Sequence, residues 1–253
     1  MRHAVSEMGE LLWLRKVRLH HVRGQRHVVR VLEGVSLKVR AGEAVCVWGR
    51  RGQGKTTLLK VAAGLARPAG GEVLFEGRDL WAMEDEQRAG LLGGWIGWVD
   101  LAAPEAVDRP VVDHVAMPVL RAGGRGGAYA RAREALGWVG ASRCAEHGWG
   151  SLDEAERARV ALARGIVHEP RLVVADDLTA ALSARAADEV GELLARWARE
   201  REAGVLASVS SLSAATWSDR VGTLYAGELL VESGASHEGG EVIELRGGPS
   251  PSG

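Results

Sequence analysis

A glycine-rich segment at residues 49–57, GRRGQGKTT, carries residue types that could bind phosphate groups. Its spacing fits G-x4-G-K-[ST], in which glycines let backbone N–H groups close around phosphate oxygens, a Lys adds positive charge and a Thr hydroxyl reaches Mg²⁺. The alternative is a glycine turn that merely precedes a lysine, but a strand pattern at 44–48 and a helix pattern at 55–65 flank the segment as the motif requires. The sequence therefore predicts binding of a nucleoside triphosphate, through Gly49, Arg50, Arg51, Gly52, Gln53, Gly54, Lys55, Thr56 and Thr57.

Two adjacent carboxylates, Asp176 and Asp177, end the continuous apolar run 171–176. Such a run is typical of a central parallel strand, and the carboxyl end of that strand is where phosphate-loop proteins hold the Mg²⁺ that bridges the phosphates. The alternative is an acidic helix cap that precedes Thr179. Beside the glycine-rich segment, the pair predicts a metal site.

The composition narrows the class of protein. The chain has 253 residues, of which 46% are hydrophobic, so it can bury a full core as one domain with an appended subdomain. A net charge of −1 gives no general attraction to nucleic acid, and Cys46 and Cys144 form no metal-binding spacing. No apolar stretch approaches the ~20 residues that cross a bilayer, and the N-terminus has no signal-peptide core. We therefore expect a cytoplasmic protein that reaches a membrane through a partner.

Hydrophobic periodicity predicts strands and helices along most of the chain. Strands are expected at 11–19, 28–39, 44–48, 71–77, 95–99, 171–176, 205–209, 220–225 and 228–232. Helices are expected at 55–65, 80–92, 110–121, 128–139, 153–168 and 184–202. Residues 1–10 are expected to be disordered, and residues 234–253 are expected to be a frayed Gly/Ser/Pro-rich tail with one strand-like run at 241–245.

Over roughly residues 11–232, the chain resembles the ATP-binding subunit of an ATP-binding-cassette (ABC) transporter. Four runs carry the resemblance: GRRGQGKTT, LVVADD, RPAGGEVLFEGRDL after the loop helix, and ERARVALARGIVHEPRLVVAD, which is similar to the family's signature helix running into its Walker B strand. The run RPVVDHVAMPVL at 109–120 most resembles the lipoprotein-releasing and macrolide-exporter branch. By this resemblance Lys55, Thr56, Thr57 and Asp176 take the family's roles, with Thr56 and Asp176 as ligands of Mg²⁺.

The resemblance implies an α/β fold of the P-loop NTPase type, spanning residues 11–233 as a cassette domain. A mainly parallel core sheet would carry residues 42–49, 95–99, 171–176 and 205–209, beside an antiparallel β subdomain built from the N-terminal strands. A helical subdomain at about 102–158 would present the signature motif and a groove for a permease's coupling helix.

Several catalytic positions depart from the family pattern. Asp177 stands where the family has the glutamate that polarises the attacking water. Because Asp is one methylene shorter than Glu, its carboxylate would stop about 1.5 Å short of the position that the glutamate reaches. A misplacement of ~1 Å can cost ~100-fold in rate. Leu101 takes the place of a glutamine, and Leu cannot touch Mg²⁺ or water. Ser210 or Ser211 stands at the switch-histidine position, and Ser183 replaces the Asp of the loop after Walker B.

The signature motif is the most altered: the family's Leu-Ser-Gly-Gly-Gln/Glu is Leu152-Asp153-Glu154-Ala155-Glu156 here. In the family, this helix start meets the γ-phosphate of ATP held by the opposing subunit. A carboxylate about 5 Å from a phosphate charge opposes that contact by ~3 kcal/mol at an effective dielectric near 20, whereas the helix dipole favours it by ~0.3–1 kcal/mol. The alternative is that Asp153 and Glu156 form a helix-capping pattern, which would serve local stability alone.

Two function classes follow. One is an ATP-binding cassette subunit whose hydrolysis is weak or lost, coupled to a membrane permease and paired with a second cassette, as a heterodimer rather than a homodimer. The other is a fully active transport ATPase that powers export or the extraction of lipoproteins or lipids. A phosphate-loop kinase or GTPase is disfavoured, because no base-specificity motif or lid sequence is present. We expect ATP and Mg²⁺ as cofactors, a location at the inner face of the cell membrane through the permease, and no nucleic-acid partner.

Overall fold

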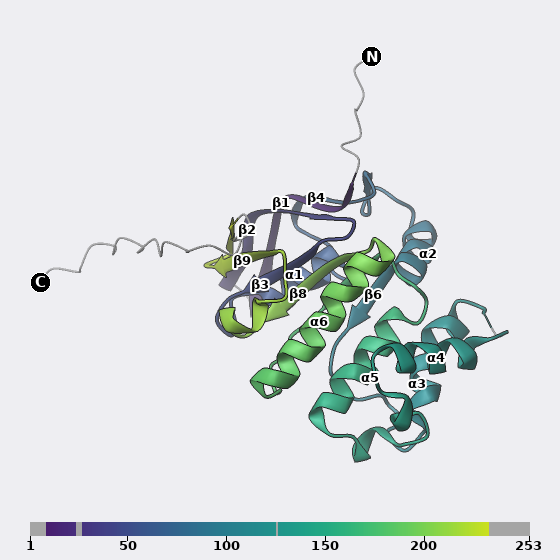
Figure 1. Ribbon diagram of the computed structural model, residues 1–253. Helices are drawn as coiled ribbons and strands as arrows, with labels where there is room; N and C mark the ends of the chain where they lie inside the picture. The colour runs from purple at the N-terminus through teal and green to yellow at the C-terminus, as the bar shows by residue number, and fades with distance from the viewer. Residues whose placement is uncertain (1–8, 24–26, 125, 233–253) are drawn as a thin grey trace, which may run out of the picture.

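The structure is a computed structural model that describes residues 9–23, 27–124 and 126–232. It contains two sheets and a group of helices to one side of them (Figure 1). Both the α/β class and the division into a core sheet, an antiparallel sheet and a helical region agree with the expectation from the sequence. The strand-like run at 241–245 lies outside the described residues.

The larger sheet has six strands in the order β10-β9-β3-β8-β7-β6. Five of them run parallel, and β10 pairs antiparallel with β9 at one edge. The strands are β3 (Ala44–Trp48), β6 (Ile96–Val99), β7 (Leu172–Ala175), β8 (Gly204–Val209), β9 (Arg220–Tyr225) and β10 (Glu228–Glu232). The carboxyl ends of β3, β6, β7 and β8 therefore lie at one edge of the sheet, where both motifs follow their strands.

The smaller sheet is antiparallel, with the order β2-β1-β4-β5. Its strands are β1 (Glu10–Arg23), β2 (His27–Arg40), β4 (Gly70–Phe75) and β5 (Arg78–Asp79). Helix α1 (Lys55–Ala62) lies between the two sheets, because its buried residues share one apolar core with Leu14 of β1 and with Val45 and Val47 of β3. The helix that follows the glycine-rich segment thus packs against both sheets.

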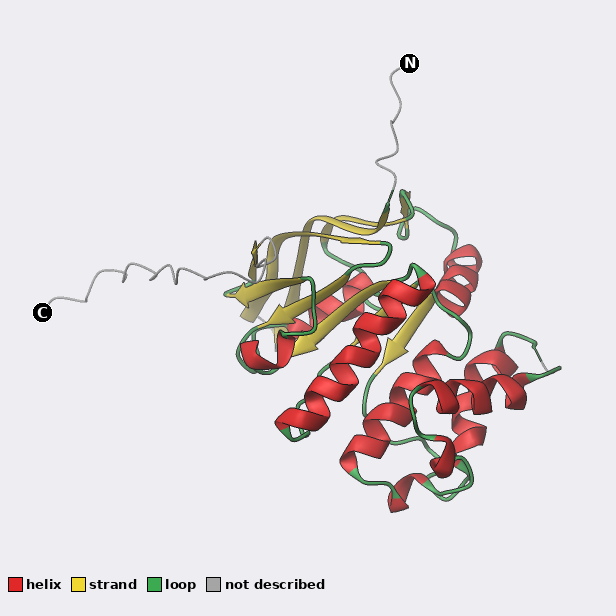
Figure 2. Cartoon of the chain, viewed as in Figure 1, coloured by secondary structure: helices red, strands yellow, loops and turns green. Residues whose placement is uncertain are grey.

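The opposite face of the six-stranded sheet shares a second core with the helices between residues 111 and 201 (Figure 2), whereas Leu91 and Leu92, in the helix before β6, pack against the first core. Because side chains alternate along a strand, Ala44 and Cys46 of β3 point into this second core while Val45 points into the first. The helices are α2 (Asp85–Trp95), α3 (Val111–Arg121), α4 (Ala128–Trp138), α5 (Glu154–Ile166) and α6 (Ala184–Arg201), with 3₁₀ turns at 142–144, 149–151 and 212–215. Helix α6 crosses the face of the sheet, and α3, α4 and α5 pack on one another beyond β6.

One helix differs from the prediction. The expected helix at 80–92 begins only at Asp85 and continues to Trp95, so the following strand starts at Ile96 instead of Trp95. The reason is that Leu80 is fully buried and its amide donates to the carbonyl of Val73 (2.9 Å), which keeps it in the turn after β5. No helix in the described part of the chain has the length and apolarity to span a membrane.

Candidate functional site

The glycine-rich segment between β3 and α1 has two positions, Gly49 and Gly54, at which a side chain does not fit. Gly54 has φ of +98°, and a Cβ added there would lie 2.7 Å from Cγ1 of Val31 on β2. A Cβ on Gly49 would lie 2.6 Å from the carbonyl oxygen of Leu224 on β9. The loop is therefore packed against both sheets, and its glycines are required by close contact as well as by conformation.

Lys55 and Gln53 fix the loop from within. The Nζ of Lys55 donates to the carbonyl oxygen of Gly49 (2.7 Å), which folds the lysine back over the loop. The amide of Ala226, in the turn between β9 and β10, donates to Oε1 of Gln53 (2.9 Å). Lys55 is also the first residue of α1, so the unpaired N–H groups of the helix start face the loop. The arrangement suits an anion such as a polyphosphate.

The carboxylates that follow β7 are tied together by a residue that sequence reasoning missed. Ser208, near the end of β8, donates from its hydroxyl to Oδ1 of Asp176 (2.9 Å) and accepts from the amide of Asp177 (2.8 Å). Strands β7 and β8 run parallel with Ala175 opposite Ala207, so the next residues meet at the carboxyl edge of the sheet. An isolated serine in the apolar run GVLASV was the only signal for this contact.

Asp177 has an unusual environment. Its φ is +51°, in the left-handed region, and its Oδ1 is buried without a hydrogen-bond partner among the described residues. Burial raises the pKa of Asp177, the positive charge of Lys55 lowers it, and the negative charge of Asp176 raises it further, so that the net pKa lies above the ordinary value. The influence of Lys55 on this pKa agrees with the positions of the loop and the carboxylate, which both follow strands at the carboxyl edge of the sheet.

The residues present fit ATP with Mg²⁺. The buried Oδ1 of Asp177 lacks a donor, and a metal-bound or attacking water is the kind of group that could supply one. Thr56, exposed at the start of α1, and Asp176 are the hard oxygen donors expected for Mg²⁺. The loop amides and Lys55 are the corresponding partners for phosphate oxygens.

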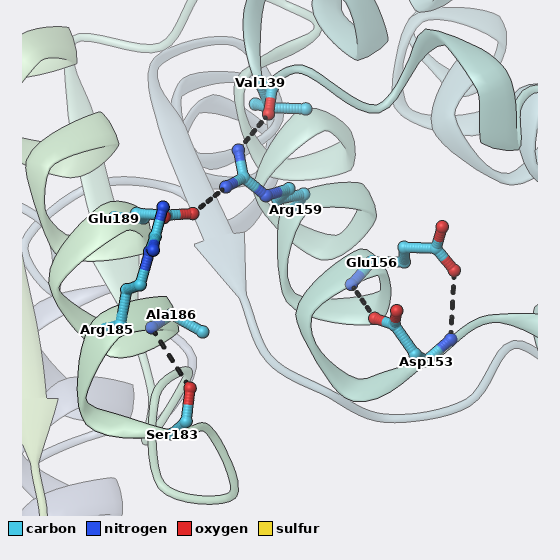
Figure 3. A network of polar contacts seen from close by, with 8 residues as sticks. All are labelled: Val139, Asp153, Glu156, Arg159, Ser183, Arg185, Ala186 and Glu189. Carbon is cyan, nitrogen blue, oxygen red and sulfur yellow. Dashed lines mark hydrogen bonds and ion pairs between the residues drawn. The ribbon is translucent and has the colours of Figure 1, made fainter.

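The acidic segment 152–156 forms the start of α5 (Figure 3). Asp153 is the N-cap: its Oδ1 accepts from the amide of Glu156 (2.7 Å), and Oε2 of Glu156 accepts from the amide of Asp153 (3.1 Å). Glu156 also forms an ion pair with Arg143 (3.0 Å). The capping alternative for this segment is thus present in the structure.

The same figure shows how α5 is joined to α6. Ser183 caps α6 by accepting from the amide of Ala186 (3.3 Å). Arg159 of α5 donates to the carbonyl oxygen of Val139 (2.8 Å) and to Glu189 of α6 (2.7 Å). The signature segment is therefore held on a braced helix.

A protein-family model described as ABC transporter matches residues 32–180, which is more than half of the chain. The chain belongs to the ABC transporter ATPase family. It is 35% identical over 205 residues to the lipoprotein-releasing system ATP-binding protein LolD of Geobacter metallireducens, covering 81% of this chain and 91% of the relative. The LolD of Chromohalobacter salexigens is 38% identical over 202 residues, covering 79% and 85%.

Solved structures have the same fold. The dimeric structure of the bacterial ABC transporter cassette MJ0796 superimposes with a TM-score of 0.79 at 24% identity, covering 88% of this chain and 98% of that chain. A post-hydrolysis dimer of the same cassette, bound to ADP and Pi, has a TM-score of 0.79 at 25% identity and the same coverage. ATP with Mg²⁺ is the cofactor of this ABC ATPase family.

Leu101, the residue expected at the glutamine position of an ABC ATPase, is partly buried and packs against the core shared with α5 and α6. Its neighbour Asp100 has polar partners instead: it accepts from Nε1 of Trp98 (2.8 Å) and forms an ion pair with Arg164 of α5 (3.0 Å). Sequence reasoning missed this pair, which joins the end of β6 to the last turn of α5.

The two candidates for the switch-histidine position follow β8. Ser210 is exposed, and the hydroxyl of Ser211 lies 3.0 Å from that of Ser213. The hydrogen bonds of the described residues do not join either serine to Asp176 or Asp177. The phosphate loop, the two carboxylates and the two serines thus follow strands β3, β7 and β8 at the same edge of the sheet.

The acidic segment 152–156 lies at the start of α5, whereas the end of β6 contacts the last turn of this helix. Arg164, at the end of α5, contacts Asp100 beside the carboxyl edge of the sheet. Asp153 lies eleven residues earlier, which is roughly 16 Å along the helix at 1.5 Å per residue. The start of α5 is therefore well separated from the end of β6.

A groove of about 960 Å³ opens between α2, α3 and α5. It is lined by apolar, basic and acidic side chains, including Trp98, Met117, Arg109 and Asp113. Met117 is 39% exposed, and Nε2 of the buried His114 has no hydrogen-bond partner among the described residues. The groove therefore offers apolar surface beside charged side chains.

Proposed function

We propose that this chain is the ATP-binding subunit of an ABC transporter that binds Mg-ATP at the loop 49–57 and couples it to a membrane permease, with hydrolysis weak or lost. One observation carries the proposal. The parts that bind phosphate and metal are assembled around Lys55 and Asp176, whereas the positions that should handle the attacking water hold Leu101, Asp177 and a serine.

Each residue has a distinct role in this proposal. The loop amides and Lys55 hold the phosphates, and Thr56 with Asp176 holds Mg²⁺, which when bound neutralises charge on the phosphate oxygens. Asp177 is the remaining candidate base, but its shorter side chain stops short of the usual position. Ser211 is neutral and cannot supply the positive charge that a histidine could, so we expect little stabilisation of the transition state from it.

A fully active transport ATPase is the alternative. It is favoured by the carboxylate of Asp177, whose buried Oδ1 has no hydrogen-bond partner among the described residues. The LolD relatives suggest lipoprotein release as the process that such a subunit would power. Either form would lie at the cytoplasmic face of a membrane through its permease.

The groove beside α3 is our candidate contact for the permease. Its apolar and charged lining suits an amphipathic segment, and its position on α5 joins it to the signature segment. We propose residues 11–233 as the cassette domain, with 102–158 as the helical subdomain that carries this contact.

Binding and turnover test the proposal separately. Millimolar Mg-ATP should raise the melting temperature, and Lys55→Ala should remove most of that rise, because ligand binding stabilises only the folded state. An unchanged melting temperature of the unmodified chain would overturn nucleotide binding. Steady-state hydrolysis should be far below ~10 s⁻¹, the common enzyme median, and a kcat near that value would favour the fully active alternative.

Reversion of single positions provides a sharper test of hydrolysis. Asp177→Glu, Leu101→Gln and Ser211→His should each restore little activity alone, since residues that act as a unit are strongly non-additive. The activity restored by the triple variant should exceed the sum of the activities restored by the three single substitutions. Recovery of full activity by Asp177→Glu alone would show that the other two positions do not limit turnover.

A further inference from the structure

Ser208 is a polar residue in a strand that is otherwise apolar. Strand β8 reads GVLASV, all six residues are buried, and Ser208 is only 2% exposed. A buried hydroxyl is costly unless it has hydrogen-bond partners. Both partners of Ser208 belong to the candidate metal site, 32 and 31 residues earlier in the chain.

The directions of the two hydrogen bonds are fixed by chemistry. The backbone amide of Asp177 can only donate, so the oxygen of Ser208 accepts there (2.8 Å). The one hydroxyl hydrogen is then directed at Oδ1 of Asp176 (2.9 Å). Oδ2 of Asp176 and the second lone pair of Oδ1 stay available to a metal ion or its water.

The bond to Asp177 acts on the backbone. A non-glycine residue with φ of +51° is conformationally costly, and the hydrogen bond from its amide to Ser208 helps to retain this turn. This backbone conformation sets the direction of the Asp177 side chain, whose Oδ1 lacks a hydrogen-bond partner among the described residues. One hydroxyl thus orients the first carboxylate directly and the second through its backbone.

We propose that Ser208 is a positioning residue for the Mg²⁺ site, holding Asp176 and Asp177 in the geometry that binds the metal beside ATP. The inference rests on the proposed function. It goes further by assigning a role to a residue that lies outside both phosphate and carboxylate motifs. Hydrogen-bond partners of metal ligands typically change metal affinity by 10–100-fold when they are removed.

The test compares nucleotide affinity with and without the metal. Calorimetric titration with the slowly hydrolysed analogue AMP-PNP gives one dissociation constant in EDTA and another in millimolar MgCl₂. Their ratio measures how much Mg²⁺ strengthens binding. We expect Ser208→Ala to lower this ratio by about tenfold or more while the dissociation constant in EDTA is unchanged, because Lys55 and the loop remain intact.

Ser208→Thr and Ser208→Val form a matched pair, since both add similar bulk at the buried site and only Thr keeps the hydroxyl. The ratio for Thr should exceed that for Val by about tenfold. A ratio unchanged by Ser208→Ala, or an equal loss of affinity in EDTA and in MgCl₂, would overturn the positioning role. An unmodified chain that binds no AMP-PNP in either buffer would overturn the proposed function itself.

Discussion

Asp153 and Glu156 each hold the backbone amide of the other at the first turn of α5, at 2.7 and 3.1 Å. Two of the three carboxylates in segment 152–156, the proposed signature, are thus committed to their own helix. Their negative charges also lie at the positive end of the helix dipole, where they stabilise it. The amide of Glu156 is consequently unavailable to a phosphate of an opposing nucleotide.

The capping role predicts unequal effects of two substitutions at one position. Asp153→Ala removes the side-chain acceptor and should lower the free energy of unfolding by about 1 kcal/mol. Asp153→Ser keeps a good N-cap and should change it by less than ~0.5 kcal/mol. Urea unfolding of the nucleotide-free chain measures both. Equal losses for Ala and Ser would show that the charge of Asp153 matters more than its cap.

The loop geometry predicts a contrast between two Gly→Ala substitutions. Gly54→Ala places a Cβ 2.7 Å from Val31 at φ of +98°, so it should cost roughly 1–3 kcal/mol of stability and abolish AMP-PNP binding. Gly90→Ala in α2 meets no atom within 4 Å and should stabilise by about 0.5–1 kcal/mol with binding unchanged. Unfolding curves and calorimetry check both. Retention of binding by Gly54→Ala would contradict the packing argument.

The fold was predictable to the extent that it depends on local patterns. Alternating and continuous apolar runs predicted most of the strands, and the resemblance predicted their division into two sheets. The capping box of Asp153 and Glu156 was visible because its partners are three residues apart. The start of α2 was missed, since Leu80 is held in a turn by Val73, a contact that the local sequence does not encode. Strand β5 has two residues, too few for a period to be detected.

The candidate site was predictable only in its motifs. The roles proposed for Lys55 and Asp176 follow from short patterns in the sequence. The contacts of Ser208 with Asp176, and of Asp100 with Arg164, depend on which strands and helices become neighbours. Pairing across 32 or 64 residues is set by sheet order and packing, which composition and spacing do not determine.

The raised pKa of Asp177 predicts a pH-dependent stability difference. A folded pKa above the unfolded value means that the stability this group contributes is present below ~pH 3.9 and is lost as pH rises through the raised pKa. Asp177→Asn cannot ionise, so the variant should be more stable than the unmodified chain at neutral pH. The difference should shrink as pH falls toward 4. Thermal unfolding across this range measures it.

The pKa of Glu189 is shifted in the opposite direction from that of Asp177, so the opposite pH dependence of stability is expected. A hydrogen bond and charge from Arg185, together with Arg159, lower the pKa of Glu189. Glu189→Gln should therefore be less stable than the unmodified chain at neutral pH, and this deficit should shrink as pH falls through the lowered pKa. If Asp177→Asn were also destabilising at neutral pH, the carboxylate would be favoured by its site and our account of its burial would be wrong.

The last prediction concerns assembly. ABC ATPase subunits form dimers, and by the family resemblance each ATP would lie between the phosphate loop of one subunit and the signature of the other. In a homodimer, each ATP would face an amide already bonded to Asp153 and a segment with three carboxylates. Repulsion of ~3 kcal/mol from one carboxylate near 5 Å exceeds the ~0.3–1 kcal/mol offered by the helix dipole. We therefore expect weak homodimerisation with Mg-AMP-PNP, and a heterodimer with an intact cassette as the stable closed form.

Combining Asp153→Ser, Glu154→Gly and Ala155→Gly should strengthen nucleotide-dependent association by at least tenfold, since removing ~1.4 kcal/mol of repulsion is enough for that factor. Asp153→Ser keeps the cap, but the two glycines weaken the first turn of α5, so urea unfolding of the triple variant must accompany the association measurement. Adding Lys55→Ala to the triple variant should abolish the gain, because association then lacks its nucleotide. Light scattering of the purified chain decides the matter: a tight homodimer of the unmodified sequence would show that Glu154 points away from the interface and that the two capping carboxylates do not repel the phosphate.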